Sequence, residues 1–337
     1  MHNAATPVFE APDEVWHYAY VRWVAEGHGL PALDSDESGA SQQAAQPPLA
    51  YLIAALLSRP FSDDDLATLL VHNPGFGYQA PGTSADNKNM LIHGEPERWP
   101  WQGTALAVHV TRLVSLGFGL LTILATYGLA LEITRRRSWA LVGAALVAFH
   151  PQFVFICSVI SNDAAAAALS TTALWAAVRI LRGGINTLSI VLAGVIAGLA
   201  ALSKTSALLV TPMLGITTVL ASARQPGTRA ARLRSALAAL GTFVTTTALV
   251  GGWWYLRNLS EYGTPLGLAL HVNTPWGRPE LASLAQLSRE LPIVARSFWA
   301  AYGWGHVTWP DGVYIALWLA TAPLLSLAAF RVIRGWA

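Results

Sequence analysis

The sequence predicts an all-α, polytopic membrane helix bundle with an acidic region outside the membrane that carries interfacial amphipathic helices. First, only 12% of its 337 residues are charged, about half the share in an average soluble domain. Second, long apolar stretches approach the roughly 20 residues that a helix needs to cross a bilayer. Third, acidic and basic residues occupy different parts of the chain. With a single cysteine, Cys157, the composition argues against soluble, disordered and disulfide-stabilised classes.

The charges divide the chain into residues 1–106 and residues 107–337. The first part holds 13 of the 19 Asp and Glu residues but only four of the 21 Lys and Arg residues. In the second part, arginines gather in four clusters, at 135–137, 179–182, 224–234 and 331–334. Short cytoplasmic loops carry an excess of Lys and Arg, so we expect these clusters inside and residues 1–106 outside. The net charge of +2 is therefore a near-cancellation, and no nucleic-acid partner is expected.

Residues 107–337 are predicted to form about seven spans, with an outer loop at 257–310. The predicted spans are 107–131, 139–159, 163–180, 188–203, 206–221, 236–256 and 311–331. A single helix over 188–221 would be about 51 Å long, too long for a ~30 Å hydrocarbon core, so this stretch is divided. Arg112, one turn into the first span, is expected to snorkel to the headgroups.

Export of residues 1–106 requires an apolar segment, yet none precedes them in this sequence. We therefore expect a first transmembrane helix upstream of Met1. The alternative is a cytoplasmic amino-terminal region, which would place all four arginine clusters outside.

Two amphipathic helices are predicted within residues 1–106. The first begins at Asp13 and Glu14, whose charges complement the helix dipole. The second extends from Gln46 to Leu57. The opposite, polar face of the first helix carries Glu14, His17 and Arg22. We expect the helix terminus to lower the pKa of Asp13, for which capping is the structural alternative. The apolar residues of the first helix recur with helical spacing: Val15, Trp16, Ala19, Tyr20, Trp23 and Val24.

Ionisable residues at membrane depth are candidate functional groups. Asp163 follows Asn162 between the second and third predicted spans, Lys204 lies between the fourth and fifth, and Arg257 ends the sixth. With the predicted topology, these residues share the outer face with Asp13. Two carboxylates and two cations there suit a phosphate-bearing substrate and proton transfer. The structural alternatives are capping for Asp163, snorkelling for Lys204 and interface anchoring for Arg257.

The acidic motif PDEVWHY at residues 12–18 resembles that of GT-C class glycosyltransferases, which use polyprenyl-phosphate-linked sugars. This superfamily includes protein O-mannosyltransferases and bacterial aminoarabinose transferases, and the chain is most similar to a little-characterised bacterial branch. The other matching segments span nearly the whole chain: QPPLAY (46–51), RLVS (112–115), HPQF (150–153), SND (161–163), GLAALSK (198–204), GWWYLRN (252–258), YG (262–263), SFW (297–299) and YGW (302–304).

The resemblance implies transfer of a sugar from a polyprenyl-phosphate donor to the hydroxyl of a glycan, lipid or protein. The reaction takes place among membrane lipids at the outer face of the cytoplasmic (inner) membrane. Asp13 is implied as the general base, Glu14 as a neighbour that orients it or helps bind a cation, and Asp163 as the second acid. The resemblance also implies that Lys204 and Arg257 bind the donor phosphate. It implies no required cofactor and leaves a divalent cation open. The candidate site is Asp13, Glu14, His17, Asn162, Asp163, Lys204 and Arg257.

Two other functions stay open. A lipid or solute transporter (flippase) would show inverted repeats and helices broken near the midplane. The hairpin at 188–221 suits this function, but no second half corresponds to it, and the acids lie at the outer surface. A non-catalytic, truncated homologue is the second alternative, because a first helix and a carboxy-terminal part are expected in the family.

Overall fold

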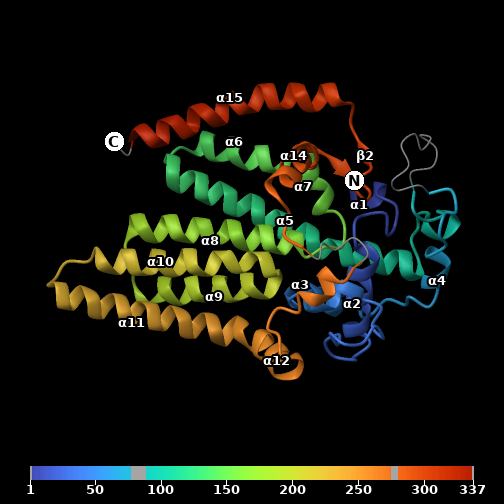
Figure 1. The fold of residues 1–337 in the computed structure, drawn as a ribbon, viewed down its shortest axis with the longest axis horizontal. Coiled ribbons are helices and arrows are strands. Elements are labelled where there is room, and N and C mark those ends of the chain that lie inside the picture. The colour runs from blue at the N-terminus through green and yellow to red at the C-terminus, as the bar shows by residue number, and fades with distance from the viewer. Residues whose placement is uncertain (1, 77–88, 275–279, 336–337) are drawn as a thin grey trace.

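The computed structural model describes residues 2–76, 89–274 and 280–335, and it is mostly helical (Figure 1). Most of the long helices run side by side in one bundle, and the short helices of the amino-terminal region gather at one end of it. Among the described residues, four helices are long and apolar enough to cross a membrane, at Gly103–Thr134, Asp163–Gly183, Thr205–Ala223 and Arg229–Tyr262. The predicted all-α membrane helix bundle is confirmed.

The bundle is built around α5, which packs against α6 and α8, and α9, which packs against α8, α10 and α11. The helices expected at 107–131, 163–180 and 188–203 are present. The bounds in the bundle are α5 (Gly103–Thr134), α6 (Arg137–Ala148), α7 (Pro151–Ile156), α8 (Asp163–Gly183), α9 (Thr187–Ser203), α10 (Val210–Ala223), α11 (Arg229–Thr247), α12 (Trp253–Tyr262) and α15 (Asp311–Gly335).

Two of the expected spans differ from the observed helices. The stretch 139–159 is divided at His150 and Pro151 into α6 and α7. Proline lacks the backbone N–H and its ring blocks the preceding turn, so His150 adopts an extended conformation with ψ 120°. The stretch 236–256 is part of a longer helical run, 229–262, in which a π-helical turn at Ala248–Gly252 joins α11 to α12.

A close approach of two glycines positions the end of α9 against α12. A Cβ atom on Gly251 would lie 2.6 Å from the carbonyl oxygen of Gly198, so larger residues would force the helices apart. One turn further on, the Tyr255 hydroxyl donates to the Ala201 carbonyl at 2.6 Å. These contacts fix Lys204, which follows α9, at the same end of the bundle as α12.

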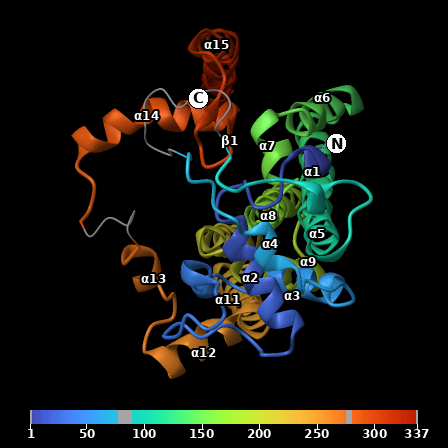
Figure 2. The ribbon, with the colours of Figure 1, turned by 90° about the vertical axis from the view of Figure 1, so that its right-hand side faces the viewer.

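The amino-terminal region covers that end of the bundle (Figure 2). There α2 packs on α3, and α3 packs on α5. The turns that follow α5 and α10, where arginines cluster, lie at the opposite end (Figure 1). The elements of the amino-terminal region are α1 (His2–Ala5), α2 (Glu14–Ala25), the 3₁₀ helix η1 (Ser41–Ala45), α3 (Leu49–Ser58), α4 (Leu66–Leu69) and the 3₁₀ helix η2 (Glu95–Glu97).

The expected outer loop at 257–310 contains regular structure. It holds α13 (Ala269–Val272), α14 (Leu284–Trp299) and a two-stranded antiparallel ladder of β1 (Ala301–Tyr302) and β2 (Val307–Thr308). The start of α14 is a capping box in which Ser283 and Gln286 each satisfy the other's backbone N–H. That Ser-x-x-Gln spacing is a signal for a helix start, and it could have identified α14 from the sequence.

A partly buried histidine joins two carboxylates in the amino-terminal region. His93 contacts Glu97 through Nδ1 at 2.6 Å and Glu10 through Nε2 at 2.8 Å. Glu10 also accepts from the backbone N–H groups of Met90 and Leu91. Burial alone would lower the pKa of His93, but the two carboxylates raise this pKa to about 9. This cluster ties the segment just before Asp13 to the loop at 89–97.

We expect the His93 cluster to make stability depend on pH. A histidine whose pKa is higher in the folded state than its unfolded value near 6.5 contributes stability that is present below 6.5 and lost as the pH rises through about 9. His93→Gln should therefore be less stable than the wild type by roughly 1–3 kcal/mol at pH 6, and the difference should shrink by pH 10. Thermal unfolding in detergent across this range measures it, and a gap that grows with pH contradicts the assignment.

Candidate active site

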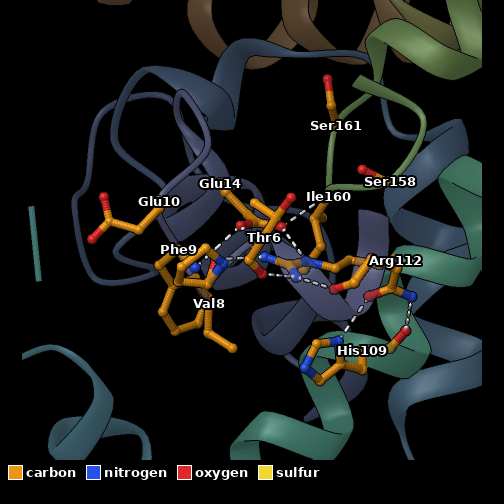
Figure 3. A network of polar contacts seen from close by, with 12 residues as sticks. Thr6, Val8, Phe9, Glu10, Glu14, His109, Arg112, Ser158, Ile160 and Ser161 are labelled. Carbon is orange, nitrogen blue, oxygen red and sulfur yellow. Dashed lines mark hydrogen bonds and ion pairs between the residues drawn. The ribbon is translucent and has the colours of Figure 1, made fainter. Parts of the chain in front are cut away.

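Glu14, the first residue of α2, forms a buried ion pair with Arg112 of α5 (Figure 3). Arg112 Nε donates to Glu14 Oε1 and a terminal nitrogen to Oε2, both at 2.8 Å, and both side chains are fully buried. The expectation that Arg112 snorkels was therefore wrong, and Glu14, which the sequence places opposite the apolar stripe of this helix, is also fully buried. Burial of a charge is costly unless it is paired, and each residue is the other's partner.

The remaining groups of this pair bind the backbone. Arg112 donates to the carbonyls of Asn3, Thr6 and Pro7 at 2.8–3.0 Å, so all five of its N–H donors are used. Glu14 also accepts from the backbone N–H groups of Phe9 and Ile160, at 3.1 and 2.8 Å. The ion pair thus joins the amino-terminal segment, α5 and the segment before α8. It fixes the start of α2, next to Asp13.

Asp13 precedes α2 but does not cap it. Its backbone is left-handed, with φ 60°, and its side chain makes no capping hydrogen bond. Instead, Asp13 Oδ2 accepts from the side-chain amide of Gln43 at 3.0 Å. The pKa of Asp13 is raised overall, mainly by burial. The charge of Asp163 also raises this pKa, whereas the charge of Lys204 and the Gln43 hydrogen bond lower it. The expected lowering by the helix terminus is therefore wrong, because desolvation outweighs it.

Asp163 and Lys204 form an ion pair beside Asp13. Lys204 Nζ donates to Asp163 Oδ1 at 2.6 Å, and the Ser161 hydroxyl donates to Asp163 Oδ2 at 3.2 Å. Both side chains remain accessible to solvent, with exposed fractions of 26% for Lys204 and 50% for Asp163. Both charges act on the pKa of Asp13. The structure thus brings together three of the four charged residues expected on one face.

Arg257 lies on α12 and binds residues of its own helix. Its guanidinium pairs with Glu261 at 3.0 Å and donates to Asn258 and to the Tyr262 hydroxyl. Its charge lowers the pKa of buried Tyr20 on α2, although burial dominates and raises that pKa. Among the described residues, Arg257 makes no hydrogen bond or ion pair with Asp13 or Asp163. Arg257 was expected to join the charged cluster. It lies at the same end of the bundle as that cluster but is not bonded to it.

His17 is buried between α2 and α3. Its Nδ1 lies 2.8 Å from the Tyr51 hydroxyl, and Tyr51 stacks on Tyr20 with ring centroids 3.9 Å apart. Burial lowers the pKa of His17 to about 3, so the imidazole is neutral at physiological pH. His17, like Glu14, was placed opposite the apolar stripe of α2, and both side chains are buried.

Asn162 belongs to a chain of amides that sequence reasoning missed. Its side-chain nitrogen donates to Gln46 Oε1 at 3.0 Å, and Gln46 Nε2 lies 3.2 Å from His271 Nε2 on α13. Gln43 lies in η1, and Gln46 follows the end of this helix three residues later. The spacing of these two glutamines, the second of which begins QPPLAY, was the available signal. Within the described residues, no group of three or more His, Cys, Asp or Glu side chains is arranged to hold a metal ion.

The comparisons with known proteins identify the family. The family model for dolichyl-phosphate-mannose-protein mannosyltransferases matches residues 100–274, more than half of the chain. That range contains Arg112, Asn162, Asp163, Lys204 and Arg257. No curated protein and no solved structure matches. The resemblance to GT-C glycosyltransferases is confirmed. The chain therefore belongs to the dolichyl-phosphate-mannose-protein mannosyltransferase family, as a multi-pass membrane glycosyltransferase that uses a polyprenyl-phosphate sugar donor.

Proposed function

We propose that this protein transfers the donor sugar to a hydroxyl group of a protein acceptor, with Asp13 as the general base. The observation that carries the proposal is the half-buried Asp13 carboxylate held beside the accessible Asp163–Lys204 pair. A base and a cation within electrostatic range of each other are what attack by a hydroxyl and departure of a phosphate require. The family's name points to a protein as the acceptor.

In the proposed reaction, the acceptor oxygen attacks the anomeric carbon while its proton passes to Asp13. The bond between the anomeric carbon and the phosphate oxygen breaks, and the polyprenyl phosphate leaves with the electron pair. The raised pKa of Asp13 favours this proton transfer, because a base becomes stronger as its pKa rises towards the working pH.

Lys204 is proposed to bind the donor phosphate and stabilise the charge that develops on it. Its ammonium group has three donors. One contacts Asp163, and Nζ makes no other hydrogen bond within the described part of the chain, so two donors are left to reach a phosphate oxygen. Asp163 then serves to hold Lys204 in place. Glu14 is proposed as a positioning residue, because four donors already occupy its carboxylate.

The reaction is proposed to occur on the extracytoplasmic side of the cytoplasmic membrane. The support is the position of the arginine-bearing turns after α5 and α10, at the end of the bundle opposite α2, which Asp13 directly precedes (Figure 1). Basic loops favour the cytoplasmic side.

The test is transfer of labelled mannose from a synthetic polyprenyl phosphate to a protein acceptor by the purified protein in liposomes. We expect transfer from the lipid donor and none from a nucleotide sugar. Lys204→Met should raise the KM for the donor about 10- to 100-fold, because loss of one charge-assisted contact costs roughly 1.5–3 kcal/mol. Arg59→Met, at an exposed position after α3, is the control and should leave the KM unchanged. Transfer from the nucleotide sugar alone would contradict the proposal.

A further inference from the structure

The Asp13 carboxylate lacks the support that an aspartate before a helix usually has. Such a side chain is normally fixed by the N–H groups of the first turn, but Asp13 makes no such bond. Among the described residues, the Gln43 amide is the one hydrogen-bond donor to this carboxylate, and it contacts Oδ2 alone. The other oxygen, Oδ1, accepts no hydrogen bond from the described part of the chain.

We propose that Gln43 is a positioning residue for the transfer reaction, which holds Oδ2 of Asp13 so that Oδ1 faces the acceptor hydroxyl. This inference rests on the proposed role of Asp13 as the base. A hydrogen bond to one carboxylate oxygen restricts rotation about the side-chain torsion, which otherwise has a broad, two-fold profile. Gln43 thereby selects which oxygen takes the proton and favours the ionised form that must be present before the reaction.

Gln43 is itself held rigidly. It is 4% exposed, and its backbone is part of η1, where its N–H donates to the Ala40 carbonyl and its carbonyl accepts from Gln46. The side chain of Gln46 is fixed by Asn162 and His271. The η1 helix also packs against α2 and α13. The amide that contacts Asp13 is therefore anchored from two sides.

The charged and titratable groups near Asp13 come from α2, α3, α8 and the residue that follows α9. Asp163 begins α8 and raises the pKa of Asp13, whereas Lys204, after α9, lowers it. Tyr51 on α3 has a pKa well above its ordinary value, and His17 on α2 a pKa near 3, both because of burial, so each is neutral near pH 7. The effects of Asp163 and Lys204 on the pKa of Asp13 oppose each other. Loss of the Gln43 hydrogen bond, which lowers this pKa, should therefore raise it measurably.

The experiment measures the pH dependence of kcat/KM for sugar transfer in wild type, Gln43→Met and Gln43→Glu. Met keeps the approximate length of Gln but donates no hydrogen bond, so the acid limb should move up by about 0.5–1 pH unit, and kcat should fall about tenfold. Glu adds a negative charge, so the limb should move further in the same direction. The donor KM should stay unchanged, because Lys204 is untouched.

Gln42→Met is the matched control. Gln42 is equally buried at 4% exposure and is adjacent in η1, yet the structure gives its amide no hydrogen-bond partner among the described residues. Its acid limb should stay at the wild-type position. An unmoved limb in Gln43→Met, or an equal shift in Gln42→Met, overturns the proposal. If Gln43→Met does not fold, the Gln43→Glu limb decides, since Glu has the size of Gln. A failure of the proposed function can be told apart from a failure of this inference, because it would appear as full activity in Asp13→Asn.

Discussion

Asp13→Asn is expected to lower kcat for sugar transfer by about 10²- to 10⁴-fold, the usual contribution of a general base. An amide has nearly the same shape as a carboxylate but does not take up the acceptor proton. Its oxygen can still accept the hydrogen bond from Gln43 that Asp13 Oδ2 accepts. The backbone of the site and the Asp163–Lys204 pair should therefore persist, and the loss should appear in kcat rather than in protein stability.

Single-turnover transfer from the polyprenyl-phosphate donor measures this effect, with thermal unfolding to confirm that the variant is folded. Asp34→Asn is the control, because Asp34 is an exposed acid of the same region and its removal should leave kcat unchanged. Asp163→Asn should instead act on the donor KM, since Asp163 holds Lys204. Wild-type kcat in Asp13→Asn would show that another group removes the proton.

Arg112→Met is expected to destabilise the protein by ~3–5 kcal/mol, the typical result of leaving one buried charge without its partner. The substitution leaves the Glu14 carboxylate in a fully buried position with only two backbone N–H donors. It also removes the three bonds from Arg112 to the amino-terminal carbonyls. We expect the amino-terminal segment that precedes α5 to detach from this helix and become sensitive to protease while the apolar helices stay folded.

Thermal unfolding in detergent and limited proteolysis measure this outcome. Arg98→Met is the matched control, because Arg98 is an exposed arginine paired with the exposed Glu95, and such pairs contribute ~0–1 kcal/mol. The double variant Glu14→Leu/Arg112→Met should be less destabilised than the sum of the single changes, because no unpaired charge remains. A loss for Arg112→Met no larger than for Arg98→Met contradicts the buried pair.

The fold was largely predictable because hydropathy and charge act along the chain. The limits of α8 and α9 follow from runs of apolar residues between polar turns, and the observed helices match them closely. The division at Pro151 and the helix α14 depend on local backbone chemistry, which average hydropathy does not register. Both have local signals, a proline and a Ser-x-x-Gln box, that could have been read from the sequence.

The candidate site was predictable only in part. The acidic motif and the topology identified Asp13, Asp163 and Lys204, and the structure places these three together. The position of Glu14 was missed because its partner, Arg112, lies 98 residues further along the chain. Helical periodicity describes the two faces of α2 but does not say which polar residue will find a buried partner.

The sequence by itself determined the class of protein, the positions of most helices and the separation of acidic from basic segments. These properties follow from the cost of placing charged and polar groups in hydrocarbon, which each segment meets independently of the others. The tertiary structure alone decided that Glu14 is buried in an ion pair with Arg112 while Asp13 stays partly exposed, and that Gln43 is the residue that contacts Asp13. Those roles depend on which side chains from distant segments meet in a desolvated space, where an unpaired charge is too costly to persist.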